Sequence, residues 1–391
     1  MGPISSDDVL AVRGERLARL RASMRAHNVE VCLLFNEPNI RYATGATAMP
    51  VWSLSTMVRC ALVCAEGAPI LFEHGNSIHR SRLRADDVRP MHAWEFFDDP
   101  GTEAAAWAAE TIDAMRQLGV AGGTVAVDRL GTPGFLALQR AGFTIVDSAS
   151  VTKAAREVKT PHEIVLFEAN GQLVLDMLSA FEAEIAPGVR ERDLLATLTG
   201  AMLQGGGEYL ATSTVCSGPN TNPWRAEATD RRLERGDVVF VDTDTVGAEG
   251  IFFCVSRTFV VGDAPPQPDQ RETYRIAHEW LEAMTSLVRP GVTCGELAEQ
   301  APTLPEKYLP QRYECMIHGV GLEEESPSVC YPIDRQSNPD RVIEEHMVLV
   351  VELYAGEVGG DHGVKLGDEI HVTASGPRVL APYPFDARLL G

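Results

Sequence analysis

Hydrophobic and polar positions in the first 150 residues alternate between two patterns. Short apolar runs bounded by glycine, proline or charged residues are typical of strands, and longer stretches with apolar residues every three or four positions are typical of helices. The predicted strands are 31–35, 61–65, 69–74, 124–128 and 143–147, and the predicted helices are 12–27 and 103–117. This alternation predicts a small α/β domain.

A helix start at Thr160 marks the beginning of a second domain. Thr160 is a good N-cap, Pro161 suits the first helical turn, and Glu163 is placed to close a capping box. The helix should run to about residue 185, because Pro187-Gly188 follows. We therefore expect domains at 1–155 and 156–391.

The second domain contains an internal repeat. The segment Pro187-Gly188-Val189 recurs as Pro290-Gly291-Val292, and the stretch 233–242 resembles 343–352 at a constant offset of 110 residues. In each stretch an apolar strand ends at an acidic residue, which is Asp242 in the first stretch and Glu352 in the second. The repeat predicts two similar αβ halves whose acidic residues meet at a shared centre.

Composition narrows the class of protein. The chain of 391 residues has 34 Lys and Arg against 55 Asp and Glu, a net charge of -21 that repels phosphates. No nucleic acid is expected as a partner. We expect no membrane association, because no apolar run approaches the ~18 residues of a membrane span. The eight cysteines include no CxxC pair, which indicates reduced thiols and a cytoplasmic location.

Four residues of the predicted centre are candidates for metal binding or catalysis. Asp242, Asp244, His318 and Glu352 are residue types that bind divalent metals or transfer protons. Because side chains alternate along a strand, Asp242 and Asp244 should share one face. The apolar run 238–241 places them in the core, where a carboxylate needs a partner.

These residues resemble a known family. The segment Asn39–Tyr42, the Asp-Thr-Asp hairpin followed by Ser256-Arg257-Thr258, the loop 318–322, Glu352 and the Lys365-Leu366 hairpin are similar to the creatinase/aminopeptidase P/prolidase family. The resemblance implies a mixed α/β (α+β) protein with a small N-terminal α/β domain and a duplicated C-terminal "pita-bread" domain. It also implies a homodimer. Within the family, the shared loops are most similar to those of its dimethylsulfoniopropionate lyases.

Two departures from the family change the expected metal site. Where its members carry the two carboxylates that bridge a pair of metals, this chain has Cys254 and Gly367. We expect a site without metal or other cofactor. Two alternatives stay open: a single Zn or Fe ion held by Cys254, His318 and Glu352, or a retired site that acts as a binding scaffold.

A third departure bears on activity. The loop that carries a functional histidine in the peptidases and creatinase has Thr221 at that position, as implied by the resemblance, so neither of those hydrolyses is expected by the family mechanism. The lyases also lack this histidine. The resemblance implies that Glu324 matches the residue that acts as the base in these lyases. In this chain Glu324 lies in an acidic triplet, 323–325.

The expected function is that of a lyase-like or hydrolase-like enzyme that uses acid–base chemistry on a small polar or zwitterionic substrate. Cation–π attraction makes tryptophans candidates for binding a cationic head group. The candidate catalytic residues are Glu324, His318, Tyr313, Asp242, Asp244 and Glu352, and the candidate substrate-binding residues are Trp52, Trp224, Thr221, Glu325 and His362.

Overall fold

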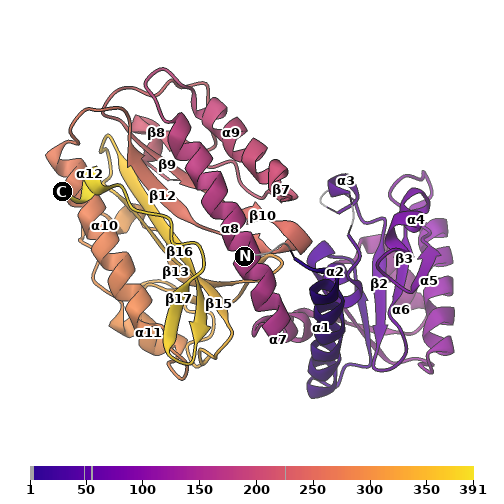
Figure 1. Cartoon of the computed structure of the whole chain (residues 1–391). Helices are drawn as coiled ribbons and strands as arrows, with labels where there is room; N and C mark the ends of the chain where they lie inside the picture. The colour runs from indigo at the N-terminus through magenta and orange to yellow at the C-terminus, as the bar shows by residue number, and fades with distance from the viewer. Residues whose placement is uncertain (1–3, 48, 54–55, 225) are drawn as a thin grey trace. The chain divides into compact units, whose positions relative to one another are not determined.

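The chain folds into two compact units (Figure 1). The computed structural model describes residues 4–47, 49–53, 56–224 and 226–391. One unit comprises Ser6–Arg156, and the other comprises Glu157–Gly391.

The N-terminal unit is built on a six-stranded mixed sheet. Its strands, in spatial order, are β4 (Asp87–Pro90), β3 (Ile70–Glu73), β2 (Cys60–Cys64), β1 (Val31–Leu34), β5 (Thr124–Val127) and β6 (Thr144–Asp147). The helices are α1 (Ser6–Ala26), α2 (Glu37–Thr44), α3 (Pro50–Ser53), α4 (Ile78–Ser81), α5 (Pro100–Gln117), α6 (Thr132–Arg140) and α7 (Ala149–Arg156). All five predicted strands and both predicted helices are confirmed, although α1 begins six residues early. The additional helices, at four to nine residues, are too short to show a clear helical period.

The C-terminal unit contains an eight-stranded sheet and a small three-stranded one. The path of the large sheet is β14 (Glu324–Cys330), β13 (Cys315–Val320), β15 (Val348–Gly356), β16 (Gly363–Thr373), β12 (Ser256–Val260), β9 (Val238–Asp242) and β8 (Val215–Ser217), with β17 (Gly376–Val379) paired to β16. The small sheet comprises β11 (Phe252–Phe253), β10 (Thr245–Val246) and β7 (Tyr209–Leu210). The helices are α8 (Pro161–Glu184), α9 (Glu191–Gln204), α10 (Pro268–Leu287), α11 (Cys294–Gln300) and α12 (Ala387–Leu390).

Helix α8 begins as the sequence predicts. The Thr160 side chain accepts a hydrogen bond from the Glu163 backbone at 3.2 Å, and the Glu163 carboxylate accepts one from the Thr160 backbone at 2.9 Å. This helix is also long and apolar enough to cross a membrane, contrary to our expectation from the sequence. More than half of its apolar stretch is buried within the unit. Because a buried core helix can be equally long and apolar, α8 is weak evidence for a membrane span.

The predicted internal repeat recurs as one local structure. In the first half, the Gly188 N–H donates to the Leu233 carbonyl at 2.8 Å, and the Leu233 N–H donates to Val189 at 2.8 Å. In the second half, segment 291–292 makes the same two bonds with Ile343, at 2.9 and 2.8 Å. A helix follows each segment, α9 in the first half and α11 in the second. Matching hydrogen bonds at matching sequence positions support the duplication.

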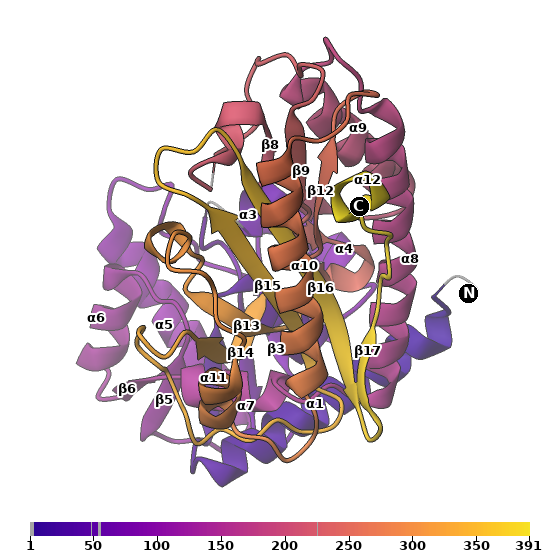
Figure 2. The ribbon, with the colours of Figure 1, turned by 90° about the vertical axis from the view of Figure 1, so that its left-hand side faces the viewer.

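Strands β15 and β16 separate the apolar core from the polar centre. Figure 2 shows α10 lying across these two strands. Leu349, Val351 and Leu353 of β15 belong to the apolar cluster that includes Trp280 of α10. Because strand side chains alternate, Glu352 faces the opposite side of the sheet, where the polar centre lies.

Candidate active site

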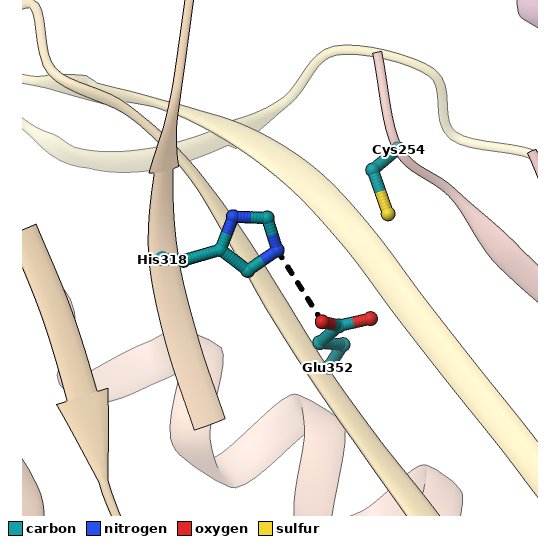
Figure 3. Close-up of side chains that lie close together, drawn as sticks. All are labelled: Cys254, His318 and Glu352. Atoms are coloured by element: carbon teal, nitrogen blue, oxygen red, sulfur yellow. Dashed lines mark ion pairs between the residues drawn. The ribbon is translucent and has the colours of Figure 1, made fainter. Parts of the chain in front are cut away.

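The structure brings the predicted polar residues together in the C-terminal unit. His318 comes from β13, Glu352 from β15, and Cys254 from the turn between β11 and β12 (Figure 3). Ligand atoms of these three residues lie within 4.8 Å of one another, as do those of Asp242, Asp244 and Cys254. The duplication thus places the acidic ends of both halves at one centre.

Asp242 and Asp244 reach the centre by a route that differs from the prediction. Strand β9 ends at Asp242, and Asp244 lies in the turn before β10 with a φ of 27°. Our expectation that both carboxylates share the face of one strand was therefore wrong. A positive φ is uncommon outside glycine, although aspartate tolerates it better than most residues. The turn, rather than strand alternation, brings the second carboxylate toward Cys254.

His318 and Glu352 form a buried ion pair. The His318 Nε2 lies 3.3 Å from Glu352 Oε1, and the two side chains are 7% and 4% exposed. Burial alone would lower the pKa of His318, but the hydrogen bond to Glu352 and the charge of that carboxylate raise it to about 9. The imidazole is therefore cationic near neutrality.

Lys365 is a site residue that our sequence analysis missed. Its ammonium group forms an ion pair with Glu352 Oε2 and lies 3.8 Å from Asp242 Oδ2. Burial alone would lower the pKa of Lys365, but Glu352 and Asp242 raise it, so the lysine stays charged. Burial likewise would raise the pKa of Glu352, which Lys365 and His318 instead lower to about 2. A signal was present in the sequence, since Lys365 precedes Gly367 by two positions and shares its strand face.

Asp242 is held by two further donors. The Ser256 hydroxyl donates to Asp242 Oδ1 at 2.8 Å, and the Cys254 thiol donates to the same oxygen at 3.5 Å. Burial, followed by the charges of Asp242 and Asp244, raises the pKa of the Cys254 thiol well above its usual value. Cys254 therefore acts here as a neutral donor.

Asp244 is the carboxyl group of the cluster that lacks an ion pair with either cation among the described residues. It accepts a hydrogen bond from the Thr212 hydroxyl at 3.1 Å. Burial, followed by the charges of Asp242 and Glu352, raises the pKa of Asp244 to about 7. A carboxyl group with this pKa can accept and return a proton near neutrality.

Glu369 is a second residue that the sequence analysis missed. It lies on the same strand face as Lys365 and accepts a hydrogen bond from the Cys254 backbone at 2.9 Å. Burial raises its pKa well above the usual range, so this side chain is a neutral acid. It adds a buried proton carrier beside the cluster without adding charge.

Trp224 and Tyr313 cover the ammonium of Lys365. The Nζ atom lies 4.6 Å from the Trp224 ring centroid and 4.8 Å from that of Tyr313, within the range of cation–π attraction. The two rings contact each other edge to face at 4.5 Å. The face of Trp224 that we expected to bind a substrate cation thus carries a cation of the chain itself. Burial also raises the pKa of Tyr313, which keeps its hydroxyl protonated.

The residues present do not fit a dinuclear metal centre. Gly367 offers no ligand, and a Cβ atom there would lie 2.9 Å from the Glu352 Cβ. The single-ion alternative needs Cys254, His318 and Glu352, which are close enough in space. However, both oxygens of Glu352 are already occupied, one by His318 and the other by Lys365. We therefore derive no catalytic step through a metal.

Two predicted substrate-binding residues have other contacts. The Thr221 hydroxyl is buried, donates to the Gly218 carbonyl at 2.6 Å and accepts from the Gly363 backbone at 2.9 Å. It therefore ties two loops together. His362 lies 3.9 Å from Asp269 and lines a cavity of about 250 Å³, to which no member of the cluster contributes.

The acidic triplet divides into residues with different environments. Glu325 is buried and forms an ion pair with Lys159 at 3.0 Å. Its carboxylate also accepts from the Leu322 backbone at 3.2 Å, which leaves it little freedom to bind substrate. Glu324, in contrast, is exposed at the start of β14. Its role as a base stays a prediction.

Trp52 lies in the N-terminal unit. Its ring stacks on His74 at 4.6 Å and contacts Phe96 edge to face at 6.1 Å. Its predicted role in substrate binding stays a prediction.

The fold and this centre define a class of protein. Residues 166–374 match the model of metallopeptidase family M24, and residues 16–158 match that of the creatinase/prolidase N-terminal domain. The chain belongs to metallopeptidase family M24. The predicted family and fold class are thereby confirmed.

Particular relatives span the whole chain. It is 33% identical to dimethylsulfoniopropionate lyase DddP of Roseovarius nubinhibens, over 98% of this chain and 89% of the relative. It is 34% identical to DddP of Roseobacter denitrificans, over 98% of this chain and 88% of the relative. Among solved structures, an Xaa-Pro dipeptidase from Bacillus anthracis has a TM-score of 0.77 at 20% identity, covering 96% of this chain and 99% of its own. The last likeness shows the fold alone.

Proposed function

We propose that this chain is a lyase that acts by acid–base chemistry, without a dinuclear metal centre, on a small polar or zwitterionic carboxylate. The observation that carries the proposal is the division of roles within the buried cluster. Lys365 lies within ion-pair distance of both Glu352 and Asp242, and His318 pairs with Glu352, whereas Asp244 pairs with neither cation among the described residues and has a pKa that suits proton transfer. The full-length similarity to two lyases supports this reaction class.

The proposed reaction is a β-elimination. Asp244 accepts a proton from the carbon next to the substrate carboxylate, and the electron pair of that bond forms the new carbon–carbon double bond. The bond between the next carbon and the leaving group breaks, and its electrons depart with the leaving group. With dimethylsulfoniopropionate, the products would be acrylate and neutral dimethyl sulfide. Buried hydrogen-bond donors can stabilise the charge that develops on the substrate carboxylate.

The contacts of Trp224 bear on the choice of substrate. Because its ring and that of Tyr313 carry the Lys365 ammonium, a sulfonium group gains nothing from these two faces. We therefore extend the proposed substrates from dimethylsulfoniopropionate to carboxylates with a sulfur, nitrogen or oxygen leaving group at the β position. The homodimer and the cytoplasmic location stay predictions.

The test combines turnover with binding on the purified full chain. We expect release of an unsaturated carboxylate from at least one member of a β-substituted carboxylate panel, measured by chromatography, and no cleavage of Xaa-Pro dipeptides. Asp244→Asn should lower kcat by about 10²-fold or more, the usual contribution of a general base. Cleavage of the dipeptides would contradict the proposal. A thermal shift with panel members but no turnover of any of them would favour the binding scaffold.

A further inference from the structure

The buried cluster contains more acid than a folded protein tolerates without compensation. Asp242 and Glu352 are 6% and 3% exposed, and Asp244 lies beside them at 9%. Buried carboxylates need a cation or a proton, since the loss of hydration costs several kcal/mol for each ion. A bound metal ion is one source of that charge, and a side chain is the other.

We propose that the ammonium group of Lys365 takes the place of a metal ion in this centre. It is the one described lysine that lies within 4 Å of two carboxylates of the cluster, Glu352 and Asp242. These carboxylates come from the two halves of the duplicated domain. Lys365 therefore joins the halves at the point where a shared cation would join them. The inference does not depend on which bond the enzyme breaks.

Gly367 gives the lysine access to Glu352. The register of the sheet places Gly367 directly opposite Glu352 on β15 and opposite Ser256 on β12. A Cβ atom at this position would lie 2.9 Å from the Glu352 Cβ and 3.3 Å from the Ser256 hydroxyl. A larger residue would crowd the Glu352 side chain at its Cβ, so glycine keeps the space beside that side chain open.

The surroundings of Lys365 favour one fixed position for its charge. The rings of Trp224 and Tyr313 lie against the ammonium at 4.6 and 4.8 Å, and the side chain is fully buried. A fixed positive charge among these carboxylates repels a divalent cation, and the repulsion is strongest where water is excluded. The same lysine thus stabilises the acidic cluster and keeps metal ions out of it.

The test replaces the charge of Lys365 while nearly preserving its length. Lys365→Met should bind Mn²⁺ at least about tenfold more tightly than the parent, a change equivalent to ~1.4 kcal/mol. Isothermal calorimetry on dialysed full-length protein measures this difference. Mn²⁺ should also raise the Tm of Lys365→Met but leave that of the parent unchanged. Lys365→Arg keeps a cation and should bind Mn²⁺ as weakly as the parent.

A matched control separates charge replacement from general damage. Lys159→Met removes another fully buried lysine, which pairs with Glu325, and should not increase Mn²⁺ affinity. A folded Lys365→Met protein with unchanged Mn²⁺ affinity would overturn the inference. If that variant fails to fold, measurements on the parent protein test the inference. One stoichiometric divalent ion per chain by elemental analysis would overturn it. A metal-free parent whose Tm Mn²⁺ does not raise would support it.

Discussion

Lys365 and Glu352 form a diagonal pair across strands β16 and β15. Glu352 of β15 lies directly opposite Gly367 of β16. Lys365 precedes Gly367 by two residues on β16, and its ammonium forms an ion pair with the Glu352 carboxylate. This relationship connects the missing carboxylate at position 367 to the charge balance of the whole centre. The first two predictions below depend on it.

The first prediction concerns metal content. Because Gly367 supplies no ligand and Lys365 occupies Glu352, the purified protein should carry well under two metal ions per chain. Activity should survive treatment with EDTA, since no step of the proposed reaction passes through a metal. Elemental analysis after dialysis measures the content. Two stoichiometric ions would contradict this prediction.

A second prediction concerns restoration of the missing ligands. Cys254→Asp combined with Gly367→Glu returns two carboxylates to the centre. Because their added negative charge offsets that of Lys365, this double variant should bind two divalent ions where the parent binds well under two. Each single variant should gain far less, because the two carboxylates would act on the same ions. Calorimetry on all three variants measures the coupling.

The structure adds a steric condition to this experiment. The Glu352 Cβ would lie 2.9 Å from a Cβ at position 367, so strand β15 or the glutamate side chain must shift. Circular dichroism should first establish that the double variant is folded. A folded double variant that binds no metal would contradict this prediction, and binding gained on further removal of Lys365 would then identify the lysine as the obstacle.

Substitution by glutamine should lower the free energy of unfolding strongly at Glu325 and only slightly at its neighbour Glu324. Glu325→Gln leaves the buried Lys159 without its partner and should cost about 3–5 kcal/mol of unfolding free energy. Glu324→Gln removes an exposed charge and should change stability by less than ~0.5 kcal/mol. Denaturant unfolding measures both. Loss of activity in the Glu324 variant at unchanged stability would favour Glu324, rather than Asp244, as the base.

His371 should make the protein less stable in weak acid. Burial, followed by the charges of Arg378 and His346, lowers the pKa of His371 to about 4, although Glu168 and Glu345 oppose this shift. The unfolded chain therefore binds a proton between about pH 6.5 and pH 4 that the folded chain does not bind. The contribution of His371 to the free energy of unfolding is fully present above about pH 6.5. It falls as the pH drops toward 4, by at most about 3 kcal/mol.

The variant His371→Gln isolates this contribution from that of the carboxylates. The difference in unfolding free energy between the parent and the variant should change across this pH window and stay constant above pH 7. Parallel urea unfolding curves at several pH values measure the difference. A difference that stays constant from pH 7 to pH 4 would show that His371 is protonated in the folded state.

Cys315 and Cys330 should form a disulfide under mild oxidation. They lie opposite each other on β13 and β14, and the Tyr331 N–H donates to the Glu314 carbonyl at 3.1 Å. This bond makes the two cysteines a non-hydrogen-bonded pair, whose Cα separation of roughly 4.5 Å suits a disulfide. A hydrogen bond from Cys315 lowers the pKa of Cys330 to about 7, which favours its thiolate.

Oxidised glutathione supplies the oxidant for this test, accepting the two electrons and two protons that the thiols lose. Peptide mapping should find a single cross-link between these residues, because the other six cysteines are buried. Cys330→Ser should abolish it. Modification of a buried cysteine in preference to this pair would contradict the prediction.

Much of the fold follows from local sequence. The capping box at Thr160 starts α8, because its donors and acceptors lie within three residues of each other. The strands of the N-terminal unit follow from short apolar runs between turn residues. The repeat at an offset of 110 residues predicted that Asp242 and Glu352 meet, since duplicated halves place equivalent residues at equivalent positions.

Other features depend on contacts between segments far apart in the sequence. Only the tertiary structure shows that Glu325 pairs with Lys159, that Thr221 holds a neighbouring loop, and that Asp244 reaches the centre through a turn. The sequence identified Asp242, Asp244 and Glu352 as acids of the centre, because residue type and the apolar strand pattern are local properties. Which cation neutralises them was decided by the register of β15 against β16, a long-range pairing that brings Lys365 to Glu352.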